Sequence, residues 1–192
     1  MGRPREFDRD HALERALQLF WKQGYGATSI DQLVSALGVN RASLYATFGG
    51  KRELYQTALE RYRESLFAAL LPSLAGEGPA LDALDRFYDA LIEYVSDGKQ
   101  RGCLLTQTIG ELCPRDRDAA QLTSDYLAAL EDVLFKTLVR AKQQGELGAS
   151  AHPRALARFL VGVAQGVIVV SKTETDAKRL RDVTRTALAA LR

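Results

Sequence analysis

The 192-residue chain is poor in the residues that build reactive or covalently cross-linked sites. It contains two cysteines, two histidines and one tryptophan. Two cysteines are too few for a disulfide framework in a chain of this length, which favours a reducing, cytoplasmic setting. His11 and His152 lie far apart, and neither has nearby cysteines or carboxylates at the spacing of metal ligands. We therefore expect no metal and no cofactor.

Long hydrophobic runs and catalytic loop motifs are also missing from the sequence. The longest apolar stretch, residues 159–170, is interrupted by Gln165, whereas a membrane span needs roughly 20 apolar residues. The first residues are charged and do not resemble a secretory signal. We find no glycine-rich phosphate loop and no Gly-x-Ser-x-Gly turn. These absences argue against a membrane protein and against the common enzyme classes.

Charge of one sign is not in excess overall, but it is unevenly distributed. The chain has 26 basic and 24 acidic residues, a net charge of +2. Residues 1–52 carry a net charge of +3, and the remaining 140 residues carry −1. A basic bias at one end favours a polyanionic partner there, although three surplus charges do not establish one by themselves.

Helical periodicity extends through almost the whole chain, and no segment alternates with the two-residue period of a strand. We therefore expect an all-α fold of about nine helices. Their expected ranges are about 8–23, 29–37, 40–48, 51–70, 81–95, 103–113, 116–144, 153–172 and 176–191. Residues 6–66 are expected to form one domain and 67–192 a second, with a Pro- and Gly-containing linker at 72–79.

Residues 29–48 have the pattern of a helix-turn-helix. Ser29 and Gln32 can form a capping box at the start of the first short helix. Gly38 stands where a left-handed residue ends a helix, and Asn40 can cap the next helix. The glycines at positions 49 and 50 end this second helix.

The second of these helices has an unusual outward face. Leu44 and Phe48 are apolar and are expected to point inward. The outward positions are small or hydrogen-bonding and include no acid: Arg41, Ala42, Ser43, Tyr45, Ala46 and Thr47. A helix without carboxylates can approach phosphates and enter a major groove. The next helix begins at Gly50 and Lys51, which offer N–H groups and a cation to a phosphate.

Two segments carry a resemblance to a known family. Residues 27–30 read Ala-Thr-Ser-Ile, and residues 37–54 read Leu-Gly-Val-Asn-Arg-Ala-Ser-Leu-Tyr-Ala-Thr-Phe-Gly-Gly-Lys-Arg-Glu-Leu. Together with Ala16–Phe20 and Gly24-Tyr25, they resemble the signature of the TetR family of bacterial transcriptional regulators. The resemblance covers residues 6–66, and beyond residue 70 it rests on the number and lengths of helices. One difference is Gly50, where the family commonly has Ser or Asn.

The resemblance implies a residue-by-residue DNA interface. Thr28 and Ser29 would hold the DNA backbone. Arg41, Ala42, Ser43 and Ala46 would face base edges, with Arg41 the best candidate for a guanine. Tyr45 and Lys51 would contact phosphates, and Arg3 and Arg5 would reach a minor groove or a phosphate. The alternatives are that Tyr45 is a core aromatic and that Arg41 and Lys51 are merely solvated.

The resemblance also implies a homodimer that reads a pseudo-palindromic operator in double-stranded DNA, joined through the last two helices. The middle helices would enclose a pocket for an unknown small-molecule effector, whose binding releases a repressor from the operator. Polar residues that could line this pocket are Tyr88, Gln107, Glu111 and Tyr126, with Tyr94 and Thr108 as further candidates. The alternative for each of them, taken singly, is a satisfied or exposed side chain, and the residues alone favour that alternative.

Two alternatives remain open from the residues alone. A helical interaction scaffold would explain the helices but not the acid-free face followed by Gly-Gly-Lys. Cys103 and Cys113 could sense oxidants or electrophiles, or could simply be small buried hydrophobes. On one helix they would lie roughly 15 Å apart, too far for a disulfide.

Overall fold

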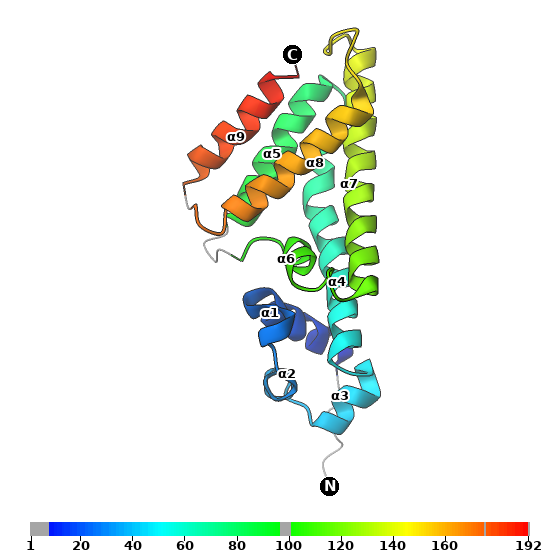
Figure 1. Cartoon of the computed structure of the whole chain (residues 1–192), viewed down its shortest axis with the longest axis vertical. Coiled ribbons are helices and arrows are strands. Elements are labelled where there is room, and N and C mark those ends of the chain that lie inside the picture. Colours follow the sequence, from blue (N-terminus) through cyan, green and yellow to red (C-terminus); the bar gives the residue numbers. More distant parts are fainter. Residues whose placement is uncertain (1–7, 97–100, 175, 192) are drawn as a thin grey trace.

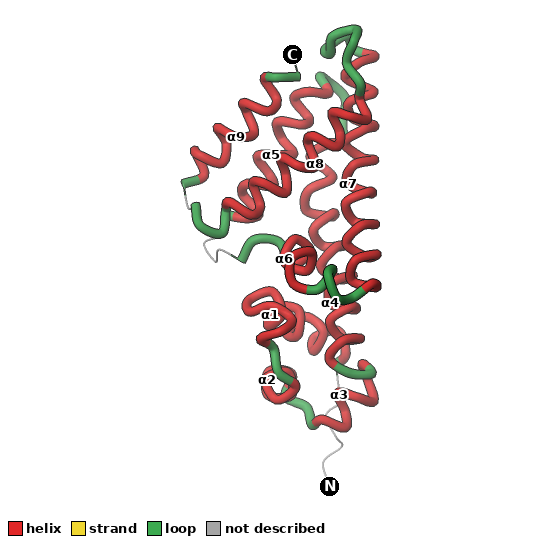
Figure 2. Tube along the Cα trace, in the orientation of Figure 1, coloured by secondary structure: helices red, strands yellow, loops and turns green. Residues whose placement is uncertain are grey.

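The computed structural model describes residues 8–96, 101–174 and 176–191, so the expected DNA contacts of Arg3 and Arg5 lie outside the described residues. In this part of the chain all regular structure is helical, which confirms the all-α prediction (Figures 1 and 2). The elements are α1 (Arg9–Ala27), α2 (Ile30–Leu37), α3 (Arg41–Phe48), α4 (Lys51–Leu70), the 3₁₀ helix η1 (Leu71–Leu74), α5 (Ala80–Val95), α6 (Leu104–Glu111), α7 (Arg117–Gln143), α8 (Pro153–Val170) and α9 (Ala177–Ala189).

The first three helices begin, and α2 and α3 end, where local capping chemistry predicts. The first helix differs at its end, because α1 kinks at Gly24 (φ 84°, ψ 172°) and continues to Ala27 instead of stopping at residue 23. Asp8 accepts a hydrogen bond from the His11 N–H at 3.0 Å and caps α1. Ser29 and Gln32 make both bonds of a capping box at α2. Gly38 ends α2 with a φ of 71°, a left-handed conformation that costs glycine little. The helix-turn-helix therefore forms as predicted.

Helix α4 connects the two halves of the molecule. In Figure 1 it rises from the lower bundle of α1, α2 and α3 and continues beside α7 in the upper bundle. Its predicted inward positions are all buried: Leu54, Ala58, Tyr62, Leu66 and Leu70. The domain boundary predicted at residue 66 falls inside this helix, so α4 belongs to both halves.

The upper half packs α8 mainly on α7 and packs α5 against α7 and α9. The predicted linker is partly ordered, because residues 71–74 form η1 and Leu74 is buried. Helix α8 is long and apolar enough to cross a membrane by length and composition, although 28% of it is buried inside the structure. Its buried residues form one stripe that packs mainly on α7, and its other faces are left uncovered.

Candidate nucleic-acid interface

Helix α3 presents the outward face that the sequence predicts. Leu44 and Phe48 are buried against the lower core, whereas Arg41, Ala42 and Ala46 are exposed. Tyr45 is 51% exposed, so the alternative that it is a core aromatic is wrong. The described face offers one guanidinium, one phenol and small side chains, a shape that can enter a major groove.

Arg41 is not free in the absence of DNA. Its Nη2 atom lies 2.6 Å from Oδ1 of Asp31 on α2, and both side chains are exposed. The hydrogen bond to Asp31 raises the pKa of Arg41 further above its ordinary value, so the guanidinium stays charged. Exposed ion pairs are weak and screened by salt. A guanine or a phosphate can therefore compete with Asp31 for Arg41.

The start of α2 corrects one part of the predicted interface. Thr28 is fully buried, and its hydroxyl donates to the Gly24 carbonyl at 2.6 Å. Its side chain thus closes the turn between α1 and α2 and does not face the solvent. The neighbouring Ser29 is exposed, and its Oγ accepts the Gln32 N–H at 3.1 Å. Of the two residues, Ser29 keeps a hydroxyl that can donate to a phosphate.

Lys51, at the start of α4, is held against an aromatic ring. Its Nζ lies 4.1 Å from the centre of the Tyr25 ring, an attractive cation–π geometry. Partial burial lowers the pKa of Lys51 below its ordinary value. At the preceding Gly50, an added Cβ would lie 3.0 Å from the Glu53 carboxylate and 3.5 Å from the Tyr45 ring. The first contact is with the mobile end of the Glu53 side chain and the second is an ordinary van der Waals distance, so a larger residue at position 50 would require only a small shift of Glu53.

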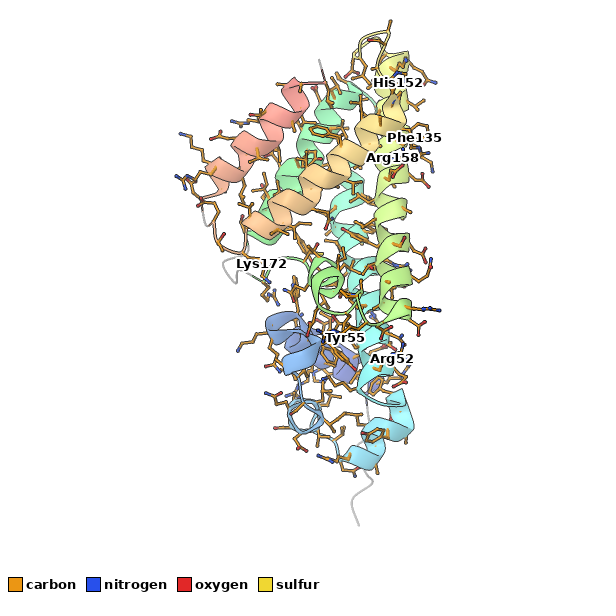
Figure 3. The ribbon with its side chains drawn as sticks, in the orientation of Figure 1. Arg52, Tyr55, Phe135, His152, Arg158 and Lys172 are labelled. Atoms are coloured by element: carbon orange, nitrogen blue, oxygen red, sulfur yellow. The ribbon has the colours of Figure 1, made fainter. Side chains whose placement is uncertain are left out.

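Polar bonds join the lower half to α6 and α7. Arg52 on α4 binds Asp116 at 2.9 Å and Asp118 at 2.8 Å. The Arg52 guanidinium holds the pKa of Asp116 at about 2, below its ordinary 3.8. One turn further along, the Tyr55 hydroxyl lies 2.9 Å from the Thr108 hydroxyl of α6. Figure 3 shows Arg52 and Tyr55 at the level where the two halves meet.

The predicted effector residues do not surround one cavity. The Tyr88 hydroxyl donates to the Leu160 carbonyl at 2.7 Å, and Tyr126 is buried with its ring on Phe67. Gln107 donates its amide to the Arg101 carbonyl. Glu111 extends instead toward the end of α1, where it accepts the N–H of Tyr25. Helical periodicity does not predict the directions of these four side chains. Tyr88, Tyr126 and Glu111 contact partners on other helices, and Gln107 contacts the loop before α6.

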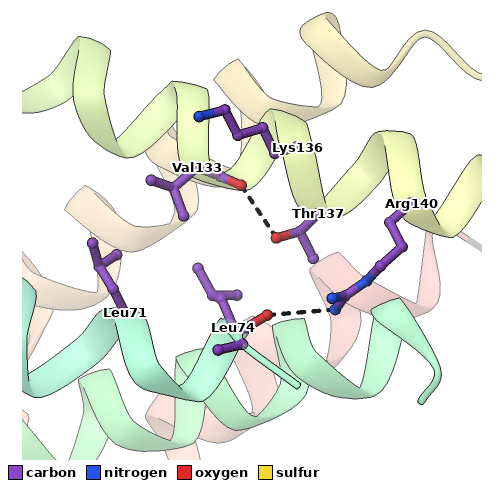
Figure 4. A pocket seen from close by; sticks show the side chains of 7 residues that line it. Leu71, Leu74, Val133, Lys136, Thr137 and Arg140 are labelled. Carbon is purple, nitrogen blue, oxygen red and sulfur yellow. Dashed lines mark hydrogen bonds between the residues drawn. The ribbon is translucent and has the colours of Figure 1, made fainter. Parts of the chain in front are cut away.

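Several hollows lie near the middle helices. One of about 370 Å³, at the end of α1, is lined by both Gln107 and Glu111, and one of about 440 Å³ lies between α4 and α7. Two others are smaller. One has a volume of about 270 Å³ between η1 and α7, lined by Leu71, Leu74, Val133, Lys136, Thr137 and Arg140 (Figure 4). A second, of about 170 Å³, lies between α6 and α8 and includes Gln107 and Cys103. Cys103 is buried and Cys113 is half-buried, and both are free thiols.

Gln165 of α8 is a candidate functional residue to which sequence reasoning assigns no role. Its Oε1 accepts the Thr106 hydroxyl at 2.8 Å. Its amide nitrogen is buried and has no acceptor in hydrogen-bonding geometry among the described residues, although the Tyr126 hydroxyl lies close enough to interact with the Gln165 side chain. Unpaired buried donors are uncommon and costly in folded proteins. The signal was present in the sequence as the one polar residue within the apolar run of α8.

Comparison with known proteins supplies the family. Residues 12–58 match the model of bacterial regulatory proteins, tetR family. Residues 80–187 match that of the tetracyclin repressor-like C-terminal domain. The chain belongs to the TetR family. It is a DNA-binding transcriptional regulator and not an enzyme, in agreement with the prediction from the sequence.

Full-length relatives of this TetR-family chain carry similar descriptions. It is 34% identical to the uncharacterized HTH-type transcriptional regulator YezE of Bacillus subtilis, over 100% of both chains. It is 31% identical to the HTH-type transcriptional repressor ComR of Escherichia coli, over 97% of this chain and 90% of the relative. A cysteine mutant of the TetR family regulator CifR, complexed with 26bp double-strand operator DNA, matches with a TM-score of 0.88, 30% identity and coverage of 100% of both chains.

Proposed function

We propose that this TetR-family protein is a cytoplasmic repressor that binds a pseudo-palindromic operator as a homodimer and leaves it when a small-molecule effector binds. The observation that carries DNA recognition is the exposed, acid-free face of α3. This face is bounded by Ser29 at the start of α2 and by Lys51 at the start of α4. Backbone N–H groups at these helix starts favour phosphates.

Within this interface we assign contacts by the exposure of each side chain. Arg41, Ala42, Ser43 and Ala46 face base edges, and Arg41 pairs with a guanine after it leaves Asp31. Tyr45 and Ser29 bind phosphates. Lys51 contributes its charge from its position beside the Tyr25 ring. Thr28 supports the turn from inside.

The homodimer uses the uncovered faces of α8 and α9. Large apolar side chains are exposed there in the single chain: Phe159, Val169 and Val170 on α8 and Val183 on α9. Gly162 and Gly166 share the exposed face of α8, and a Cβ added at either would meet open space. Large exposed apolar patches commonly mark interfaces, and small residues allow two helices to approach closely. A second copy would bury this face.

The effector site is proposed among the middle helices, close to Gln165. A ligand with a hydrogen-bond acceptor would satisfy the buried Gln165 amide nitrogen and would be favoured in the state that admits it. Such a ligand shifts the population toward the DNA-incompetent state only if it binds that state more tightly. Helix α4, shared by both halves, would carry the displacement to α3.

Selection of duplex DNA from a random pool tests this proposal. The parent chain and Tyr45→Ala are used in parallel, with Tyr45→Phe as a matched variant that removes only the hydroxyl. We expect the parent to enrich a palindrome and Tyr45→Ala to enrich none, because the phenol lies on the exposed face of α3. Tyr45→Phe separates loss of the phosphate bond from loss of the ring.

The salt dependence of binding to the selected operator provides a second criterion. With about 6–10 phosphate contacts per dimer, affinity should fall on the order of 10³-fold or more between 50 and 200 mM salt. A flat salt response, or a dimer that enriches no DNA after unfolding and refolding to remove any bound effector, would contradict the proposal.

A further inference from the structure

The carboxylate of Glu111, the last residue of α6, sits on the backbone at the end of α1. It accepts the N–H of Tyr25 at 3.0 Å through Oε2 and the N–H of Gly26 through Oε1. Two successive backbone N–H groups that converge on one anion form a nest, a geometry that suits a carboxylate. The bond joins residues 86 positions apart in the chain. It links the effector half directly to the DNA-binding half.

The two glycines beside this bond leave room for the carboxylate. Gly24 has a φ of 84°, and a Cβ added there would lie 2.8 Å from Oε2 of Glu111. A Cβ added at Gly26 would lie 2.8 Å from Oε1 of Glu111. The backbone of Gly26 is outside the left-handed region, so a side chain there meets only the carboxylate. The glycines thus leave room for Glu111 at the kink near the end of α1.

The nest is bonded to the helix-turn-helix on its far side. The Gly24 carbonyl accepts the hydroxyl of Thr28, the residue before the N-cap of α2. The Gln23 amide donates to the Thr28 hydroxyl and to Oε1 of Gln32 on α2, each at 3.1 Å. The Tyr25 ring lies beneath Lys51 of α4. A displacement of Glu111 therefore acts on the starts of both α2 and α4, the two helices that flank α3.

We propose that Glu111 is a positioning residue for operator binding, which fixes the helix-turn-helix to α6 and so couples the effector half to DNA affinity. The inference rests on the proposed function, since it requires an operator and a movable α6. Glu111 contacts no DNA in this proposal. Its effect on affinity comes from holding the two recognition helices of a dimer at the spacing of the half-sites.

The sign of the expected effect distinguishes this role from simple electrostatics. Glu111→Gln removes one negative charge per subunit close to the DNA-binding half, so charge alone would raise affinity for DNA. Glutamine also turns an NH₂ group toward a backbone N–H and loses one of the two bonds. Positioning by Glu111 predicts that the operator Kd rises by about fivefold or more. The slope of log K against log salt should stay unchanged, because no phosphate contact is removed.

The control is Glu14→Gln on α1. Glu14 is exposed and accepts a bond from Gln18 of the same helix, so its replacement removes the same charge without touching α6. Operator Kd is measured for the full-length dimers of both variants and the parent. Hydrogen exchange at the amides of residues 25 and 26 reports the bond without DNA. We expect faster exchange and weaker operator binding for Glu111→Gln, and neither for Glu14→Gln.

A second variant separates loss of the bond from general destabilisation. Gly26→Ala keeps Glu111 but places a methyl where its carboxylate lies. We expect it to reproduce the Kd of Glu111→Gln, and the double variant to add less than about twofold to either single change, because both remove one interaction. Additive effects would overturn the proposal. So would an unchanged Kd for Glu111→Gln, or an equal loss for Glu14→Gln.

Failure of this inference can be told from failure of the proposed function. If the parent selects no operator, the proposed function is wrong and the role of Glu111 falls with it. If the parent binds its operator and Glu111→Gln binds it as tightly, only the role of Glu111 is overturned.

Trp21, the single tryptophan of the chain, donates to the Gly102 carbonyl beside this junction at 3.0 Å. Its fluorescence confirms that each variant keeps the surrounding contacts.

Discussion

At the scale of single residues, the proposed recognition helix α3 carries one exposed guanidinium that could bind a base, with several small side chains around it. Arg41 is that group, and Asp31 holds it through an exposed ion pair. Its guanidinium can form two bonds to the O6 and N7 atoms of a guanine, which is the commonest specific contact in the major groove. The ion pair with Asp31 therefore fixes the position of the Arg41 side chain in the DNA-free protein.

We predict that Arg41→Ala relaxes the selected operator at one base pair in each half-site. The loss of a bidentate contact should cost about 1–3 kcal/mol of discrimination at that position. Competition between the selected operator and single-base variants measures it. Asp31→Asn is the matched change, since it frees Arg41 without removing it and should keep the same preference. Equal discrimination by Arg41→Ala and the parent would show that Arg41 contacts only phosphate.

At the scale of elements, the junction between α4 and α7 depends on a charged bond. Asp116 caps α7 by accepting the N–H groups of Asp118 and Ala119 and also binds Arg52 of α4. Its pKa is about 2, lower than its ordinary 3.8, mainly because of the Arg52 bond. A carboxyl whose pKa is depressed by folding stabilises the fold above its ordinary pKa. That contribution is lost as the pH falls from about 3.8 through about 2.

We predict that Asp116→Asn destabilises the protein at pH 7 by about 1 kcal/mol or less, because the pair is partly solvated. Asparagine is as good an N-cap as aspartate, so the change isolates the charge. The difference from the parent should shrink between pH 3.8 and 2. Urea unfolding at pH 7 and pH 2.5 measures it. Asp125→Asn is the control, because the Asp125 carboxylate accepts a bond from Gln121 of its own helix. A difference independent of pH would contradict the assignment.

At the scale of the whole molecule, the single chain is incomplete along α8 and α9. Four large apolar side chains remain about half exposed there: Phe159, Val169, Val170 and Val183. The operator proposed here has two half-sites, and each needs its own α3. In the proposed homodimer, dimerisation would therefore determine operator affinity as well as stability, since a monomer can bind only one half-site.

We predict that Phe159→Glu combined with Val183→Glu yields a folded monomer of 21.1 kDa where the parent is a dimer. Two like charges would be buried opposite their copies, whereas in the monomer both positions face water. Sedimentation velocity measures the mass, and circular dichroism verifies the helices. Gln121→Glu on the exposed face of α7 is the control and should leave the dimer intact. A doubly substituted chain that remains dimeric would place the interface elsewhere.

The sequence alone determined the helices and the caps of the DNA-binding half. The capping groups of Asp8, Ser29 and Asn40 lie three residues from their backbone partners, and Gly38 acts on its own backbone. Such interactions depend on order in the chain and can be read from it. The outward face of α3 followed in the same way, because helical spacing separates Leu44 and Phe48 from their neighbours.

Only the tertiary structure decided what faces each helix. The burial of Thr28, the place of Lys51 on the Tyr25 ring and the bonds of Glu111 to the end of α1 depend on packing between segments, some of them 86 residues apart. The sequence predicts Glu111 to line an effector pocket because it places this residue on a middle helix. It does not show that the carboxylate bonds to the backbone of Tyr25 and Gly26. A helical pattern fixes the face on which a side chain lies, but the direction of a long polar side chain depends on which hydrogen-bonding groups the fold brings within its reach.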